Sequence, residues 1–389
     1  MKQKKKPPTL SQNEIQRYAR HLVLPEVGRE GQQKLKAASV LIVGAGGLGS
    51  PIALYLAAAG IGHLGIVDQD VVDFSNLQRQ IIHREADLGY PKAESARERV
   101  LHLNSEILVD VYNESFTSEN AFRIAEPYNL IVDGTDNFPT RYLLNDLCVL
   151  TGKPYIYGSI FRFEGQASVF YAEEGPCYRC LFPEPPPPEL APSCTVGGVL
   201  GILPGTIGTI QATETIKLIL GVGEPLIGKL MLYNALDLSF KFLNLQKNPH
   251  CKVCGDHPEI TELIDYMEFC GVLSQEHDPG SAGEEWDITA QELAERLAHG
   301  DKLRLIDVRE PLEVEISHLE GSDLIPLDQL PSRLSELESS QEIVLICRAG
   351  IRSVRALGVL IKAGFRNVKN LKGGINAWAE NVDTSLPVY

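Results

Sequence analysis

The sequence lacks any apolar run long enough to cross a lipid bilayer, which takes roughly 18 residues. The longest candidate, residues 199–210, is interrupted by three glycines and one proline. The first ten residues are basic, but no apolar stretch follows them, so we do not expect a secretory signal peptide. The sequence therefore predicts a protein with no membrane partner.

Positive charge is also scarce. The chain has 36 Lys and Arg against 51 Asp and Glu, which gives a net charge of −15. Nucleic-acid binding depends on a basic face that contacts phosphates, so we expect no nucleic-acid partner. The 44% of hydrophobic residues is typical of a globular protein. At about 150 residues per domain, 389 residues predict about two or three domains.

A disulfide framework is not expected either. Four of the eight cysteines form two C-x-x-C pairs, a spacing that is more typical of metal binding in a reducing compartment. We therefore predict that the protein is cytoplasmic.

The first part of the chain alternates between strand and helix patterns. Strands are expected at 39–43, 63–68, 107–113 and 129–133, and helices at 48–59, 92–103 and 141–151. This order predicts an α/β domain of the Rossmann-like, doubly wound type, with helices on both faces of a parallel sheet. Residues 155–171 are β-rich, 183–192 form a proline-dense loop, and 206–220 are helical.

A second α/β pattern follows a stretch with few periodic signals. Residues 257–285 contain several Gly, Pro and acidic residues and are interpreted as a linker. From 286 to 389 we expect helices at 289–299 and 353–363, and strands at 303–307, 343–347 and 368–371. The predicted domains are therefore 10–256 and 286–389.

A glycine-rich loop connects the first strand to the following helix. Its glycines, Gly44, Gly46, Gly47 and Gly49, match G-x-G-x-x-G, which lets the backbone approach a phosphate group at a helix N-terminus. Asp68 ends the next strand, where a ribose-binding acid belongs. This pattern alone leaves open a nicotinamide or flavin dehydrogenase, or a glycine turn that is purely structural.

Polar residues further along the chain favour phosphate chemistry. Asn76, Arg79 and Lys92 would stabilise charge that develops on a departing pyrophosphate. A dehydrogenase would instead leave this region open for nicotinamide. Asp136 follows a parallel strand, where it could hold Mg²⁺ or cap the next helix.

Several motifs together resemble the MoeB/ThiF adenylyltransferases, relatives of the ubiquitin-activating enzymes. These are R-Y-A-R at 17–20, the glycine loop, N-L-Q-R-Q at 76–80, G-T-D-N at 134–137 and C-Y-R-C at 177–180. The resemblance covers 10–256. It implies ATP-dependent adenylylation of the C-terminal glycine of a ubiquitin-like sulfur carrier, similar to MoaD or ThiS, that ends in Gly-Gly.

The resemblance also implies roles for individual residues and a homodimer. Asp136 would position Mg²⁺ and the reacting groups, and Arg79 would take part in the chemistry. The implied ATP ligands are Asp68 at the ribose, Asn76, Arg79 and Lys92 at the phosphates, and Arg20 from the partner subunit.

Two cysteine pairs predict a metal site. Cys177 and Cys180 form the first C-x-x-C, and Cys251 and Cys254 form the second. Four thiolates suit a closed, tetrahedral Zn²⁺ site with a structural role. A redox dithiol or unrelated free thiols are the alternatives, and the family resemblance also implies zinc.

Three further cysteines lie outside these pairs. Cys194 follows the proline-dense loop, where a thiol could react with the adenylate or the carrier, although it could also be a small buried side chain. Cys148 and Cys270 belong to no motif and are predicted to be packing residues.

The eighth cysteine, Cys347, lies between a β-rich run and a helix. Loop amides and a helix N-terminus at such a position stabilise a thiolate or a persulfide anion. Arg348 and Arg352 add positive charge. Arg352 follows the cysteine as C-x4-R, shorter than the C-x5-R of protein phosphatases, which favours sulfur over phosphate.

Residues 286–389 resemble the rhodanese sulfurtransferases, through L-I-D-V-R-E at 305–310, H-L-E-G at 318–321 and G-G-I-N-A-W at 373–378. The resemblance implies a persulfide on Cys347, loaded by a cysteine desulfurase or from thiosulfate, which converts the activated carrier to a thiocarboxylate. An inactive rhodanese fold used for docking is one alternative. A nicotinamide-dependent Rossmann oxidoreductase with a sulfur-handling domain is another.

Overall fold

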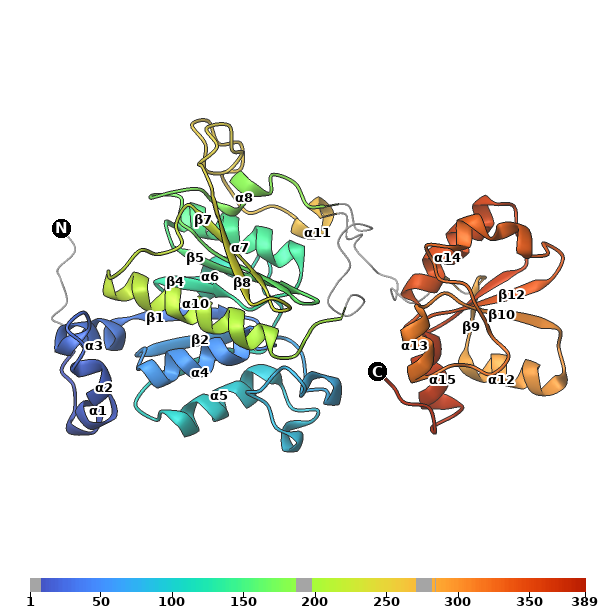
Figure 1. Ribbon diagram of the computed structural model, residues 1–389, viewed down its shortest axis with the longest axis horizontal. Helices are drawn as coiled ribbons and strands as arrows, with labels where there is room; N and C mark the ends of the chain where they lie inside the picture. The colour runs from blue at the N-terminus through green and yellow to red at the C-terminus, as the bar shows by residue number, and fades with distance from the viewer. Residues whose placement is uncertain (1–7, 187–197, 271–281, 284) are drawn as a thin grey trace. The chain divides into compact units, whose positions relative to one another are not determined.

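The structure is a computed structural model that describes residues 8–186, 198–270, 282–283 and 285–389. It consists of two compact units, Met1–Leu273 and Ser274–Tyr389 (Figure 1). Within the described ranges, every helix is too short or too polar to cross a membrane.

The first unit is built on an eight-stranded sheet with the order β3-β2-β1-β4-β5-β6-β7-β8. Pairing is parallel from β3 to β5 and antiparallel from β5 to β8. The strands are β1 Ser39–Val43, β2 His63–Val67, β3 Leu108–Tyr112, β4 Leu130–Asp133, β5 Tyr155–Phe161, β6 Glu164–Phe170, β7 Lys229–Asn234 and β8 Ser239–Asn244.

Helices cover both faces of the sheet, because the central strands direct apolar side chains toward both faces. In β1, Val40 and Ile42 belong to one core cluster, and Leu41 and Val43 to the other. The first cluster includes α3 Gly28–Ala37, α4 Gly49–Ala59, α5 Lys92–Leu103 and α10 Leu203–Leu220. The second includes α6 Ala121–Ala125, α7 Phe138–Thr151, α8 Tyr178–Leu181 and α11 Tyr266–Phe269. Short helices α1 Gln12–Arg17, α2 Ala19–Leu22, η1 Phe74–Asn76 and η2 Glu85–Asp87 complete the unit.

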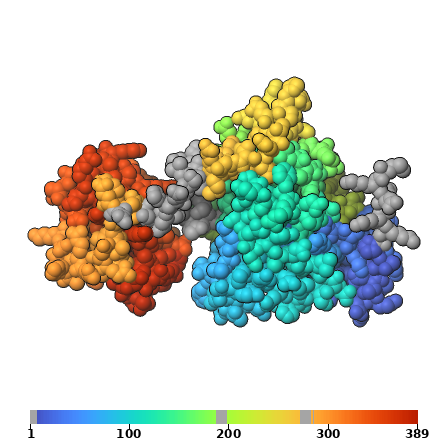
Figure 2. Space-filling view, turned by 180° about the vertical axis from the view of Figure 1, so that it is seen from behind, coloured from blue at the N-terminus to red at the C-terminus, as the bar shows by residue number. Residues whose placement is uncertain are grey.

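The predicted doubly wound, Rossmann-like α/β fold is confirmed for β1 to β5. The sheet then continues into an antiparallel half, of which only the β-rich stretch 155–171 was predicted. Helix α7 begins at Phe138, earlier than predicted, because Asn137 caps it and a proline occupies its first turn. The segment after β8, drawn in yellow, projects from the body of the first unit (Figure 2).

Part of the segment interpreted as a linker, 257–285, is folded. Tyr266 and Cys270, at the ends of α11, are buried in the second core cluster of the first unit. The Tyr266 hydroxyl donates a hydrogen bond to Asp146 Oδ2 on α7 at 2.9 Å. This buried bond fixes the segment on the first unit.

The second unit has a five-stranded parallel sheet with the order β11-β10-β12-β13-β9. Apolar residues of β12 alternate between two cores, with Ile343 and Leu345 on one face and Val344 and Ile346 on the other. This arrangement confirms the predicted second α/β unit. Its elements are β9 Asp287–Ile288, α12 Ala290–His299, β10 Leu303–Asp307, α13 Pro311–Ile316, β11 Asp323–Leu324, η4 Leu330–Ser332, η5 Leu334–Glu336, β12 Glu342–Ile346, α14 Ile351–Lys362, β13 Val368–Leu371 and α15 Gly374–Asn381.

Candidate functional site

The glycine loop of the first unit joins β1 to α4 and contacts the loop after β4. A Cβ atom on Gly44, whose φ is +98°, would lie 2.6 Å from the carbonyl oxygen of Gly134. A Cβ atom on Gly49 would lie 1.9 Å from the carbonyl oxygen of Gly44. The loop therefore needs glycine at these positions, and the loops that follow β1 and β4 meet backbone to backbone.

Asp68 anchors the glycine loop from the end of β2. Its Oδ2 accepts a hydrogen bond from the Ala45 N–H at 2.8 Å, and its Oδ1 accepts one from the Asp70 N–H at 2.9 Å. Burial raises the pKa of Asp68, and these two hydrogen bonds oppose that shift. The buried Lys92, the first residue of α5, pairs with Asp70 at 2.8 Å. Asp68 thus contacts the loop directly, and the Lys92 amine lies at the neighbouring Asp70.

Arg79 and Gln80 approach the same loop from the segment after η1. The positions that Cβ atoms on Gly46 and Gly47 would take lie 3.6 Å from Gln80 Nε2 and 3.8 Å from Arg79 Cγ, respectively. Gln80 is buried, and its Oε1 has no hydrogen-bond partner in the part of the chain that the structure describes. The Arg79 guanidinium itself donates to the carbonyl oxygen of Ser75 at 3.0 Å, so the structure places the stem of Arg79 and the amide of Gln80 beside the loop.

Asn76 lies in the turn that leads to Arg79. Its Oδ1 accepts a hydrogen bond from the Asp73 N–H at 3.3 Å, so its amide stabilises η1. Its backbone carbonyl accepts the N–H groups of Arg79 and Gln80. Asn76 therefore stabilises the turn that carries the Arg79 and Gln80 side chains.

Two acidic residues follow β4 in different environments. Asp133 is fully buried and accepts hydrogen bonds from Tyr155 Oη at 2.7 Å and Thr135 Oγ1 at 2.6 Å. Burial raises the pKa of Asp133, although Arg141 opposes this. Asp136 is exposed. The alternative that Asp136 caps the next helix is wrong, because the Oδ1 of Asn137 accepts the Thr140 N–H at 2.9 Å.

One predicted residue is not brought to the loop, and another is not described by the structure. Arg20 is exposed on α2, and among the described residues it makes no hydrogen bond or ion pair with the glycine loop. Its expected role involves a second copy of the chain. Cys194 lies outside the described residues.

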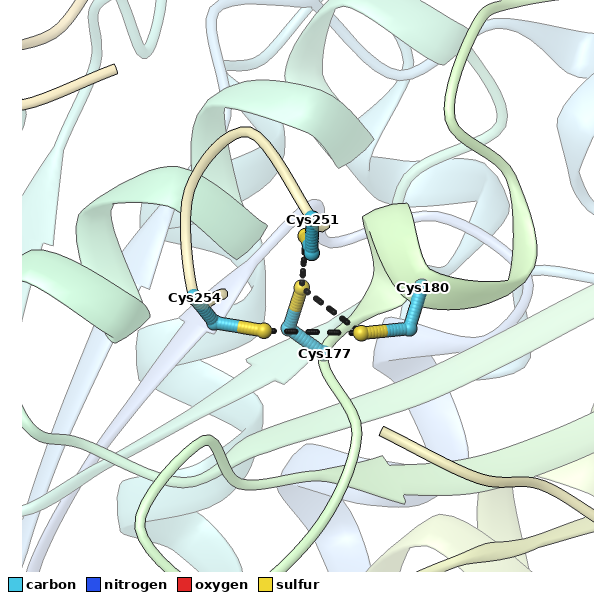
Figure 3. Close-up of side chains that lie close together, drawn as sticks. All are labelled: Cys177, Cys180, Cys251 and Cys254. Carbon is cyan, nitrogen blue, oxygen red and sulfur yellow. Dashed lines mark hydrogen bonds between the residues drawn. The ribbon is translucent and has the colours of Figure 1, made fainter. Parts of the chain in front are cut away.

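The four cysteines of the two C-x-x-C pairs converge on one point (Figure 3). Cys177 Sγ lies 3.9 Å from Cys180 Sγ and 3.6 Å from Cys251 Sγ, and Cys180 Sγ lies 3.4 Å from Cys254 Sγ. A disulfide would need about 2.05 Å. Zn–S bonds of about 2.3 Å in a tetrahedron place sulfurs about 3.8 Å apart. The cluster therefore could hold zinc.

The cluster's own electrostatics also suit a metal. Contact with the neighbouring sulfurs, first that of Cys177, lowers the pKa of Cys180 to about 6. The same crowding raises the pKa of Cys177. The sulfurs therefore share protons unevenly, and a cation that binds thiolates would displace the remaining protons. The two other described cysteines of this unit, Cys148 and Cys270, are buried in its core, as predicted.

In the second unit, Cys347 directly follows β12 and is 1% exposed. Its Sγ accepts hydrogen bonds from the Gly350 N–H at 3.1 Å and from Ser353 Oγ at 3.2 Å. Gly350 has a φ of +90° and forms the N-terminal cap of α14, which begins at Ile351, two residues earlier than predicted. The thiol thus lies at a helix N-terminus with two donors directed at the sulfur, an arrangement that stabilises negative charge.

A second loop supports the thiol loop. The Ile375 N–H donates to the carbonyl oxygen of Cys347 at 2.8 Å, and the Asn376 N–H donates to that of Arg348 at 3.1 Å. A Cβ atom on Gly374 would lie 2.4 Å from the carbonyl oxygen of Cys347. The G-G-I-N-A-W segment therefore fixes the backbone that carries the thiol.

Charged side chains surround this loop in pairs. Both Nη atoms of Arg352 donate to Glu313, at 2.6 and 2.5 Å. Arg309 is fully buried and pairs with Asp307 at 2.5 Å. The Arg348 guanidinium lies over the Tyr389 ring, 4.9 Å from its centroid. These contacts fix the charged side chains around the loop.

Sequence reasoning did not identify two buried residues near the glycine loop, Asp133 and His83. An acid at the end of an apolar strand was a usable signal for Asp133. His83 has no local signal, because its contact is with Ala45, 38 residues earlier.

Comparisons with known proteins match each unit to a protein family. The pattern of the ThiF family matches residues 18–253, and that of the rhodanese-like domain matches residues 289–381. A probable adenylyltransferase/sulfurtransferase MoeZ of Mycobacterium tuberculosis is 49% identical over 386 residues, which cover 98% of this chain and 96% of the relative.

A sulfur carrier protein adenylyltransferase of Thermus thermophilus is 52% identical over 267 residues, which cover 67% of this chain and 98% of the relative. Among solved structures, Escherichia coli MccB with ATP has a TM-score of 0.55 at 26% identity. The match covers 61% of this chain and 74% of that chain.

Proposed function

This chain belongs to the ThiF family and carries a rhodanese-like domain, and from this premise we propose that it activates and then thiolates a sulfur carrier. The first unit adenylylates the C-terminal glycine of a ubiquitin-like carrier that ends in Gly-Gly, and the second supplies sulfur from a persulfide on Cys347. The observation that carries the proposal is that one chain contains both a glycine loop anchored by Asp68 and a loop that holds the Cys347 thiol. The 49% identity to MoeZ, over 98% of the chain, supports the same combination.

The residues at the glycine loop fit ATP. Gly44, Gly46, Gly47 and Gly49 leave no side chain between the loop backbone and a phosphate group, and the N-terminus of α4 favours negative charge. Beside them, Asp68 would hold the ribose, and Asn76, Arg79 and Lys92 would hold phosphates.

The residues also fit the two expected metals. Mg²⁺ usually binds one or two carboxylates together with the phosphates of a substrate, and the exposed Asp136 offers such a carboxylate. It would neutralise phosphate charge there. The Cys177, Cys180, Cys251 and Cys254 cluster would hold a structural Zn²⁺ with no open position.

Activation solves a chemical problem. A carboxylate is a poor electrophile, because its leaving group would be oxide. Transfer of AMP to the carboxylate releases pyrophosphate and provides AMP as the leaving group, with Arg79 and Lys92 stabilising the charge. Asp136 positions the reacting groups.

The second unit then supplies the nucleophile. The outer sulfur of the Cys347 persulfide attacks the carbonyl carbon, AMP leaves, and an acyl disulfide forms. A thiolate then attacks the Cys347 sulfur and forms a new disulfide with it. The S–S bond of the acyl disulfide breaks, and the carrier leaves as the thiocarboxylate. Cys194 could supply this thiolate and would then be joined to Cys347 by a disulfide.

Further parts of the proposal concern the setting of the reaction. The active form is a homodimer in which Arg20 of one subunit contacts the ATP of the other. The sulfur donor is a cysteine desulfurase or thiosulfate, and molybdenum cofactor biosynthesis is the pathway we favour. Among the described cysteines none forms a disulfide, which supports the cytoplasm as the compartment.

Mass spectrometry of the carrier tests the proposal. Incubation with ATP, Mg²⁺ and a carrier that ends in Gly-Gly should give the adenylate, and thiosulfate should then give the thiocarboxylate. Cys347→Ala should retain the adenylate and lose the thiocarboxylate. Binding of NADH without any adenylate would instead favour a nicotinamide-dependent oxidoreductase and contradict the proposal.

A further inference from the structure

A buried imidazole lies directly against the glycine loop. His83 is 6% exposed, and its Nε2 lies 3.0 Å from the carbonyl oxygen of Ala45. A carbonyl oxygen can only accept, so Nε2 must carry the proton of this hydrogen bond. His83 therefore donates to the second residue of the G-x-G-x-x-G loop.

The other side of the imidazole is anchored. His83 Nδ1 lies 2.8 Å from Ser95 Oγ on α5, and Ser95 Oγ lies 2.8 Å from Asp87 Oδ2. Asp87 is itself paired with Arg84 at 2.6 Å. His83 is thus the end of a chain of close polar contacts through Ser95 and Asp87 that fixes the plane of its ring, and all members of this chain are buried except Arg84.

The Ala45 residue is consequently held on both sides. Its N–H donates to Asp68 at 2.8 Å, and its carbonyl accepts from His83. In a planar trans peptide the carbonyl and the following N–H point in opposite directions. With the Ala45 carbonyl directed at the buried imidazole, the Gly46 N–H is directed away from it.

We propose that His83 is a positioning residue for the nucleotide: by fixing the Ala45 carbonyl, it directs the Gly46 N–H at a phosphate group of ATP. The proposal deepens the proposed function and rests on ATP binding at the glycine loop. His83 touches neither the nucleotide nor the carrier. Its contribution is the orientation of one backbone donor before the nucleotide arrives.

Two amide substitutions separate this role from simple packing. His83→Gln places an amide nitrogen where Nε2 was, so it retains the donor to Ala45. His83→Asn places its amide near the Nδ1 position, so it retains the bond with Ser95 but leaves the Ala45 carbonyl without its donor. The two variants are matched in polarity and differ in the bond that the proposal requires.

The experiment measures carrier-dependent exchange of pyrophosphate into ATP, together with calorimetric binding of ATP. His83→Asn should raise the KM and the Kd for ATP about tenfold, the cost of an unsatisfied buried acceptor, with little change in kcat or in the KM for the carrier. His83→Gln should stay within about threefold of the unsubstituted protein. Sulfur transfer from thiosulfate to cyanide, by the second unit, should be the same in both variants.

Several outcomes would overturn the proposal. Equal KM values for the two amide variants would show that the donor to Ala45 has no role, and a loss confined to kcat would contradict positioning of ATP. Should His83→Asn not fold, Ser95→Ala replaces it: it removes the anchor of the ring and should raise the KM for ATP about threefold. An unchanged KM in Ser95→Ala would overturn the proposal. Failure of the unsubstituted protein to bind ATP would instead contradict the proposed function itself.

Discussion

Replacing Gly374 with alanine should disable sulfur transfer while leaving carrier activation intact. Gly374 has a φ of +63°, and an added Cβ atom would lie 2.4 Å from the carbonyl oxygen of Cys347 and 2.6 Å from the carbonyl carbon of Arg348. Both neighbours are backbone atoms of the thiol loop, so no side-chain rotation can relieve the overlap. Either the loop or the start of α15 must shift by about 1 Å to reach ordinary contact.

Two costs add in this variant. The left-handed backbone costs about 1–2 kcal/mol once a Cβ is present. The forced shift adds about 1–3 kcal/mol, as for other overpacked sites. A displacement of about 1 Å at reacting atoms can lower a rate by about 10²-fold. The second unit should therefore lose about 2–5 kcal/mol of stability and most of its sulfur transfer.

Gly300→Ala is the matched control. Gly300 ends α12 in the same unit with a φ of +84°, and an added Cβ atom there would have nothing within 4 Å. It should show only the backbone cost, about 1–2 kcal/mol, with normal sulfur transfer. The assays are urea unfolding, thiosulfate-to-cyanide transfer and pyrophosphate exchange. The reasoning is refuted if both variants lose equal stability and retain equal transfer rates, or if Gly374→Ala also abolishes the exchange.

Three further predictions concern stability. Cys251→Ser should abolish zinc content in metal analysis and lower the unfolding temperature of the first unit alone; full zinc retention would contradict the metal site. Asp146→Asn breaks the buried pair with Arg179, whose atoms lie 2.8 Å apart, and should cost about 3–5 kcal/mol in urea unfolding. A cost below about 1 kcal/mol would mean that the pair is dispensable. Burial alone would raise the pKa of Glu313, but hydrogen bonds from Arg352 hold it below the ordinary 4.5. Because the folded-state pKa is lowered, this stabilisation is present above pH 4.5 and is lost as the pH falls below it, so Glu313→Gln should flatten the pH dependence of unfolding in that range.

The features that could be predicted from the sequence are those with local signals. The strand before Gly44, the acid that follows β2 and the helix that starts at Lys92 each follow from a short run of residues. The thiol loop is equally local, since Cys347 lies between an apolar strand and a helix. The four-cysteine cluster was predictable because each pair has a diagnostic spacing.

The remaining features depend on partners far away in the sequence. Residues 257–270 have weak periodicity, and contacts with distant residues, such as the bond between Tyr266 and Asp146, 120 positions apart, fix this segment on the first unit. The edge strand β8 has apolar residues such as Phe240 and Phe242 on an exposed face, so its burial pattern does not alternate. His83 is identified only by its contact with Ala45, which no local pattern contains.

The four-cysteine cluster also has a topological consequence. It joins Cys177 and Cys251, which are 74 positions apart, and the chain between them includes α10, β7 and β8. Once a metal is bound, this part of the chain is a closed ring, and its ends stay together even when the rest of the unit unfolds. In the loop-entropy description of cross-links, closing a ring of this size removes roughly 4 kcal/mol of conformational freedom from the unfolded chain. Metal loading would therefore act like a covalent cross-link around β7 and β8, the last two strands of the antiparallel half of the sheet.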